Sequence, residues 1–97
     1  MLTREQFLLT KLAEECNEVA QMALKTQQFG MNECKPNQTL TNKDRLHDEL
    51  NDLNAIIAML NAECDFKYNP DSKKMIKKMD RVDTFYGLSH ALGKVEG

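Results

Sequence analysis

The sequence is short of the features that mark several classes of protein. Its 13 Lys and Arg are outnumbered by 15 Asp and Glu, so there is no overall positive field to attract a nucleic-acid backbone. The three cysteines, Cys16, Cys34 and Cys64, are odd in number and lack CxxC spacing, and the opening MLTREQF contains no apolar run typical of a signal or membrane segment. We therefore expect a soluble cytoplasmic protein with reduced thiols, bound to neither nucleic acid nor membrane.

Strand-like alternation, internal repeats and low-complexity segments are also missing, which favours an all-α fold. The 97 residues suit a single domain, residues 1–97. A chain of this size buries only roughly 60 to 70% of its unfolded surface, so contacts with further copies are an expected source of stability. We expect a homo-oligomer, either a dimer or a tetramer made of two dimers.

A long first helix is predicted at the start of the chain. It begins at the capping box Thr3-Arg4-Glu5-Gln6, and its apolar residues recur at helical spacing as far as Phe29-Gly30. Residues 30–42 are rich in Gly, Pro, Asn and Thr, and we expect them to form a loop.

The second helix is predicted to begin at Thr41 or Asn42, either of which can cap it. One apolar stripe then recurs at helical spacing as far as Cys64, and the pattern fades at Asp65-Phe66. Cys16 and Cys64 occupy apolar positions of the two helices, so we expect both thiols to lie in the core.

A third helix is expected after Asn69-Pro70-Asp71, with asparagine as the cap and proline as the first helical residue. It runs towards Tyr86-Gly87 with a narrow apolar edge. Its remaining surface is basic through five side chains: Lys73, Lys74, Lys77, Lys78 and Arg81. A short fourth helix is expected over residues 88–94. The predicted fold is thus an antiparallel all-α bundle of two long helices, a basic third helix and a short C-terminal helix, completed by oligomerisation.

Both long helices carry acids within or beside their apolar stripes. At about 100° per residue, Glu15 falls inside the first stripe with Glu18 on its border. By the same projection Glu49 falls inside the second stripe with Asp52 just beyond. Residues three apart lie about one turn apart on one face, so antiparallel packing would direct four carboxylates into a shared cleft. Such a group stays ionised only around a cation, and all-oxygen ligation suits Mg²⁺ or Mn²⁺.

Acids spaced by three are also common on solvated helix faces, which is the simplest alternative. Glu15 and Glu49, however, intrude on apolar stripes, where an unpaired carboxylate costs several kcal/mol. Their positions favour the interpretation as metal ligands, and with it a magnesium-dependent phosphate chemistry.

These residues resemble the MazG-like all-α NTP pyrophosphohydrolases, whose pattern is EExxE on one helix and ExxD on the next. The pattern occurs here as EECNE, residues 14–18, and ELND, residues 49–52. The longer segments KLAEECNEVAQMALK, ELNDLNAIIAML and KKMDRVDTFYG are similar to the two motif helices and to the basic, tyrosine-ended third helix. Small phage-type members look most similar, and the resemblance covers nearly the whole chain.

The resemblance implies hydrolysis of a nucleoside triphosphate, preferably a deoxynucleoside triphosphate, to the monophosphate and pyrophosphate. Glu15, Glu18, Glu49 and Asp52 would be metal ligands, and Glu14 would hold a second metal or orient the attacking water. All five are predicted catalytic residues. The role would be nucleotide-pool control or house-cleaning in the cytoplasm, that of a host if the protein is phage-encoded.

The substrate would be held by side chains and metal, because the sequence has no GxxxxGK[ST] loop. Candidate contacts to phosphate or base are Lys25, Lys74, Lys78, Arg81 and Tyr86. A solvated surface charge is the alternative for each lysine. Asn51 and Asn54 stand where relatives often carry glycine and an apolar residue, which leaves the base-binding side open. His47 falls on a different face from Glu49 and is expected at the surface.

Two rival functions can be compared with the enzyme. A di-iron carboxylate bundle uses Glu-x-x-His pairs, and the sequence has none. A non-catalytic helical module would bind a protein partner through a methionine-rich surface. The six methionines are scattered rather than clustered, which favours the enzyme and leaves the interaction module as the alternative.

Overall fold

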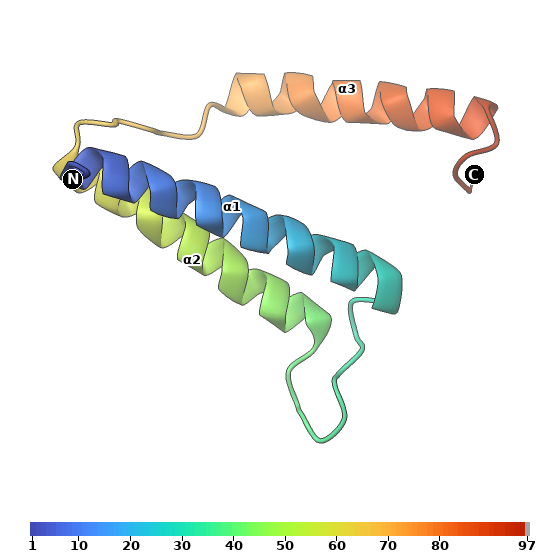
Figure 1. Ribbon diagram of the computed structural model, residues 1–97. Coiled ribbons are helices and arrows are strands. Elements are labelled where there is room, and N and C mark those ends of the chain that lie inside the picture. Colours follow the sequence, from blue (N-terminus) through green and yellow to red (C-terminus); the bar gives the residue numbers. More distant parts are fainter. Residues whose placement is uncertain (97) are drawn as a thin grey trace.

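The computed structural model describes residues 1–96, which form three helices (Figure 1): α1, Arg4–Phe29, α2, Asn42–Glu63, and α3, Ser72–Ala91. The only β-pairing among these residues is an isolated bridge between Cys34 and Thr41 in the predicted loop. The all-α class is therefore confirmed. No helix within residues 1–96 combines the length and apolar character needed to span a membrane.

Helix α1 begins and ends where the sequence predicts. The Thr3 hydroxyl accepts the Gln6 backbone N–H at 3.1 Å, and the Gln6 side-chain oxygen accepts the Thr3 N–H at 2.9 Å. This reciprocal pair is the predicted capping box. The helix ends at Gly30, whose φ of 97° suits a residue without a Cβ and whose N–H donates to the Thr26 carbonyl.

Helix α2 begins with a second capping box, which the sequence interpretation did not include. The Thr41 hydroxyl accepts the Asp44 N–H at 3.1 Å, and the Asp44 carboxylate accepts the Thr41 N–H at 3.0 Å. Hydrogen bonds from the Thr41 backbone and side chain lower the pKa of Asp44. Thr41 is thus the cap among the two predicted candidates, and the helix ends at Glu63, close to the predicted position.

The two helices form an antiparallel hairpin whose seam contains the buried residues (Figure 1). Leu8 and Leu60, both 1% exposed, are the buried hydrophobic side chains of residues 1–96. Near the loop the seam is polar, because the side chain of buried Asn42 donates to the Gly30 carbonyl at 2.9 Å. At the opposite end the Arg4 guanidinium and the Glu63 carboxylate form an ion pair at 2.9 Å.

Helix α3 differs from the prediction at both ends. The cap is Asp71, which accepts the Lys74 N–H at 3.0 Å, whereas Asn69 and Pro70 precede the helix. Two hydrogen bonds between the Asn61 side chain and the Tyr68 backbone, 2.8 and 3.1 Å, hold the preceding segment along the end of α2. The helix therefore begins after the proline.

The prediction of a separate fourth helix was also wrong, because α3 continues through Gly87 to Ala91. One glycine costs a helix about 1 kcal/mol, which does not outweigh the hydrogen bonds on either side. The turn that ends α3 comes at Gly93, where φ is 73°.

Helix α3 lies apart from the hairpin, as Figure 1 shows. No Cα atom of α3 comes within 8 Å of one in α1 or α2. The radius of gyration is 17.2 Å, against about 12.5 Å for a compact domain of this length. Among the described residues of one chain, only α1 and α2 pack together. A bundle that includes α3 would need more than one chain and remains a prediction.

The prediction that Cys16 lies in the core was wrong. Its thiol is exposed, whereas that of Cys64 is half-buried, and neither these two nor Cys34 forms a disulfide within the described residues. Cys16 follows Glu15, which faces α2, and one residue turns a helix by about 100°. It therefore belongs to a second apolar stripe of α1 that no part of residues 1–96 covers.

Candidate metal centre

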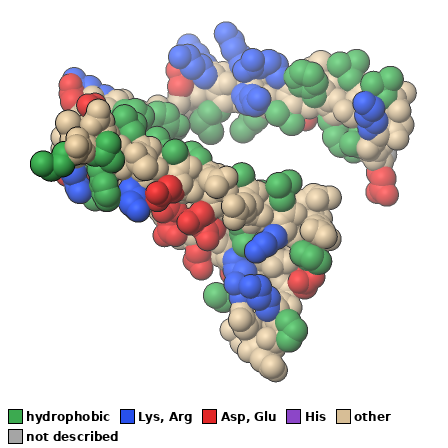
Figure 2. All heavy atoms as spheres, viewed as in Figure 1, with side chains coloured by type: hydrophobic (Ala, Val, Ile, Leu, Met, Phe, Trp, Pro, Cys, Tyr) green, Lys and Arg blue, Asp and Glu red, His purple; other side chains and the backbone are tan. Residues whose placement is uncertain are grey.

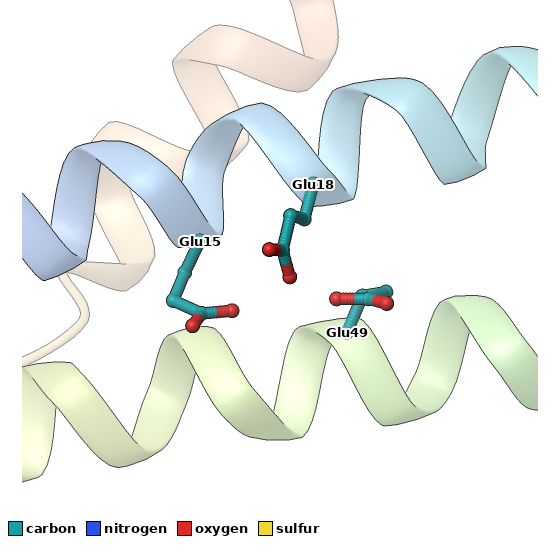
Figure 3. Close-up of side chains that lie close together, drawn as sticks. All are labelled: Glu15, Glu18 and Glu49. Carbon is teal, nitrogen blue, oxygen red and sulfur yellow. The ribbon is translucent and has the colours of Figure 1, made fainter.

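Three carboxylates meet across the seam of the hairpin (Figure 3). Glu15 and Glu18 project from successive turns of α1, and Glu49 projects towards them from α2. One carboxylate oxygen from each lies within 4.8 Å of the others. At this spacing the three groups could hold one metal ion after small side-chain movements.

Burial makes this arrangement costly without a cation. Glu15 and Glu49 are half-buried and Glu18 is exposed, as the helical projection predicted. One oxygen of Glu15 and one of Glu49 are out of contact with solvent and have no hydrogen-bond partner. Orphaned carboxylate oxygens of this kind are the groups that a hard cation would satisfy.

The pKa values of Glu15 and Glu49 also indicate that a cation would stabilise the cluster. Desolvation raises the pKa of Glu15, and the negative charges of Glu18 and Asp52 raise it further. Desolvation also raises the pKa of Glu49, followed by the hydrogen bond and the charge of Glu18. Both carboxyl groups are therefore in a setting that disfavours the ionised form unless positive charge is supplied.

The other two predicted acids lie at the edge of the cluster. Asp52 is exposed one turn beyond Glu49, and although its charge contributes to both raised pKa values, it is outside the group of three. Glu14 is exposed and accepts a hydrogen bond from the Lys11 ammonium at 3.1 Å. It is outside the group of three and already has a cationic partner.

An open hollow of about 330 Å³ adjoins the carboxylates. It is lined by Glu18, Gln21, Met22, Lys25 and Glu49. Lys25 therefore lines the same hollow as two of the acids, Glu18 and Glu49. A negatively charged ligand bound here would meet Lys25 on one wall and any cation held by the acids on the other.

A second hollow, of about 180 Å³, shares Met22 and Lys25 with the first. Its other lining residues are Phe29, Glu33, Lys35, Asn42 and Arg45. Figure 2 shows Lys and Arg side chains beside acidic ones on the hairpin, towards the loop. The Arg45 Nε is buried without a hydrogen-bond partner, while another guanidinium nitrogen donates to the Gln38 side chain.

The sequence interpretation missed Arg45 and Lys35. Arg45 precedes Glu49 by four residues, so the two share one face of α2, and this spacing was the available signal. Lys35 had no such signal, because it reaches the site only through the path of the loop.

The predicted substrate contacts of α3 are not brought to the acids within one chain. Lys74 and Lys78 line a separate open hollow of about 430 Å³ beside Tyr68. The Tyr86 hydroxyl donates to the Glu96 carbonyl. Arg81, like the rest of α3, is remote from α1 and α2. His47 is exposed, as predicted.

No protein-family model, curated protein or solved structure matches the chain. What the site can do therefore follows from its own side chains. Three converging carboxylates suit a hard divalent cation, and Lys25 and Arg45 suit the oxygens of a phosphate group.

Proposed function

We propose that this protein is a magnesium-dependent nucleoside triphosphate pyrophosphohydrolase. It would convert a nucleoside triphosphate, preferably a deoxynucleoside triphosphate, to the monophosphate and pyrophosphate, in nucleotide-pool control or house-cleaning. The observation that carries the proposal is the pair of solvent-inaccessible, unpartnered oxygens of Glu15 and Glu49 facing Glu18. The resemblance to the MazG-like enzymes agrees with this use of the acids.

The residues present fit a hard divalent cation. Glu15, Glu18 and Glu49 would hold it, with Asp52 as the adjacent fourth carboxylate, and Mg²⁺ or Mn²⁺ accepts such oxygen ligands. Bound there, the cation would neutralise phosphate charge and acidify a water molecule.

The basic wall of the site would orient the triphosphate. Lys25 lies between the two hollows, so its ammonium can contact phosphate oxygens beside the acids. The Arg45 guanidinium, which has an unpartnered Nε, offers further N–H donors for the leaving pyrophosphate. Phe29, on the wall of the second hollow, offers an aromatic surface to the base. Glu14 would have to release Lys11 before it could orient the attacking water.

The experiment is hydrolysis of a panel of nucleoside and deoxynucleoside triphosphates with Mg²⁺, followed by ion-exchange chromatography of early time points. We expect the monophosphate and one equivalent of pyrophosphate. Glu49→Gln should lower the rate by more than about a hundredfold. Asp48→Asn, an exposed neighbour on the same helix, should leave it unchanged. A diphosphate intermediate, orthophosphate as the first product, or equal rates for the two variants would contradict the proposal.

A further inference from the structure

Helix α3 carries an apolar stripe that nothing in the described chain covers. Met75, Met79, Val82 and Tyr86 recur every three or four residues, and each is about half exposed, from 48% to 57%. Figure 2 shows hydrophobic side chains along the side of α3 towards the hairpin, with most Lys and Arg on the other side. An amphipathic helix of this kind is stabilised in water mainly by packing its apolar face.

Helix α1 carries a matching stripe beside the seam. It consists of five exposed side chains spaced by three or four residues: Leu9, Ala13, Cys16, Ala20 and Leu24. Leu9 and Leu24 are 44% and 68% exposed. Small residues between two leucines let another helix approach closely and place its larger side chains in the gaps.

The chain exposes more surface than a compact monomer of its mass. The chain exposes 7992 Å², whereas a compact monomer of 11.1 kDa exposes about 5,700 Å². The excess of about 2,300 Å² per chain is in the range that obligate homodimers bury.

Charge favours contact between α3 of one copy and the hairpin of another. Helices α1 and α2 together contain nine acidic and five basic side chains, a net charge of −4. Helix α3 contains five basic and two acidic side chains, a net charge of +3. The two parts attract each other, so a second copy supplies both the apolar and the charged complement of each part.

We propose that the chain forms a dimer in which α3 of each copy packs its Met75–Tyr86 stripe on the Leu9–Leu24 stripe of the other. Every copy provides one donor helix and one acceptor stripe, so two identical contacts close the dimer. The hydrogen bonds between Asn61 and Tyr68 tie the segment before α3 to the end of α2, and α3 lies apart from its own hairpin. This inference does not rest on the proposed hydrolysis.

The oligomeric state of the full chain tests the proposal. Light scattering at micromolar concentration should give twice 11.1 kDa, and Val82→Asp should give a monomer because it places a charge in the stripe. Thr84→Asp is the matched control, since it puts the same charge on the opposite face of α3 and should leave the dimer intact. Circular dichroism checks that both variants keep α1 and α2 helical. A monomeric wild type, or equal effects of the two variants, would overturn the proposal.

Cysteine labelling tests which surface is buried, without any change in sequence. In the dimer Cys16 lies under the partner's α3, so iodoacetamide should label it several-fold more slowly than loop residue Cys34, which is exposed in one chain and serves as the internal reference. Val82→Asp should remove that difference. If Cys16 in a wild-type dimer reacts as fast as Cys34, the copies join through another surface and the proposed exchange is wrong.

Discussion

At the scale of single residues, Glu15 and Glu49 occupy the seam of a hairpin although their ionised forms are disfavoured there. Their raised pKa values arise from desolvation first and from neighbouring acids second. A seam made only for stability would contain apolar side chains at these positions. The two acids therefore carry a cost in stability, and this cost can be measured.

Glu49→Gln should raise the melting temperature of the metal-free protein by a few degrees, because it removes a desolvated charge that faces Glu18. The same substitution should abolish the stabilisation that added Mg²⁺ gives the wild type. Thermal unfolding followed by circular dichroism, with EDTA and then with Mg²⁺, measures both effects. Asp48→Asn is the control and should change neither. A variant that still gains full stability from Mg²⁺ would remove Glu49 from the site.

The stability of the metal-free protein should fall as the pH rises above the ordinary glutamate value of 4.5. A carboxyl group with a higher pKa in the folded state binds its proton more tightly there, so its favourable contribution is complete below the unfolded pKa and is lost through the folded one. Asp44 and Glu63, whose pKa values are lowered, have the opposite effect and lose their contribution as the pH falls.

Urea unfolding at a series of pH values separates these effects. The stability of the double variant Glu15→Gln, Glu49→Gln should no longer fall as the pH rises. It should still fall as the pH is lowered, because Asp44 and Glu63 are unchanged. Added Mg²⁺ should stabilise the wild type more as the pH rises, because the ligands must be ionised. Parallel pH curves for the wild type and the double variant would contradict the assigned cause.

The positions of these acids could be predicted because a helical projection needs only local geometry. Glu15 and Glu49 were placed inside apolar stripes, and both are half-buried. Arg45 and Lys35 were missed because their neighbourhood depends on how residues 30–41 fold back beside α2. A spacing rule that applies within one helix cannot predict the path of this loop.

At the scale of elements, capping explains where the hairpin helices start. Thr41→Ala removes one half of the Thr41–Asp44 box and should lower the free energy of unfolding by about 1 kcal/mol. Thr39→Ala, an exposed loop position outside the cap, should have little effect. Urea unfolding of both variants measures the difference, and equal stabilities would show that the box adds nothing to the start of α2.

The helix boundaries were predictable to the extent that local side chains decide them. The Thr3 box and the turn at Gly30 act within a few residues, and both occur where the sequence indicates them. The start of α3 was misplaced because Asn69 and Asp71 are both good caps, and the choice depends on the contact of Tyr68 with Asn61 on α2. That contact joins two elements and leaves no local signature.

At the scale of the whole molecule, a seam with two fully buried leucines among residues 1–96 is a small core. If the copies exchange α3, the melting temperature should rise with protein concentration, because association stabilises the folded state. Thermal unfolding over about a hundredfold range of concentration measures the shift. Val82→Asp should show no such dependence. A concentration-independent wild type would contradict the dimer even if the hairpin were stable.

The arrangement of α3 could not be predicted from the sequence. Its periodicity correctly shows an apolar edge from Met75 to Tyr86, but a pattern on one helix does not identify what covers it. The predicted bundle was expected to be completed by oligomerisation, but the sequence did not indicate which helix packs within a chain and which packs between chains. In one chain, α3 is separate from the hairpin.

The separation of α3 from the hairpin also divides the folding reaction. Helices α1 and α2 are neighbours in sequence, joined by residues 30–41 of the same chain, so their pairing is a first-order event and should be fast. If the apolar stripe of α3 packs on another copy, it gains its contacts only when two chains associate, at a rate that depends on protein concentration. Refolding would then show an early phase independent of concentration and a later bimolecular phase. The carboxylates would come together in the first phase, before the copies meet.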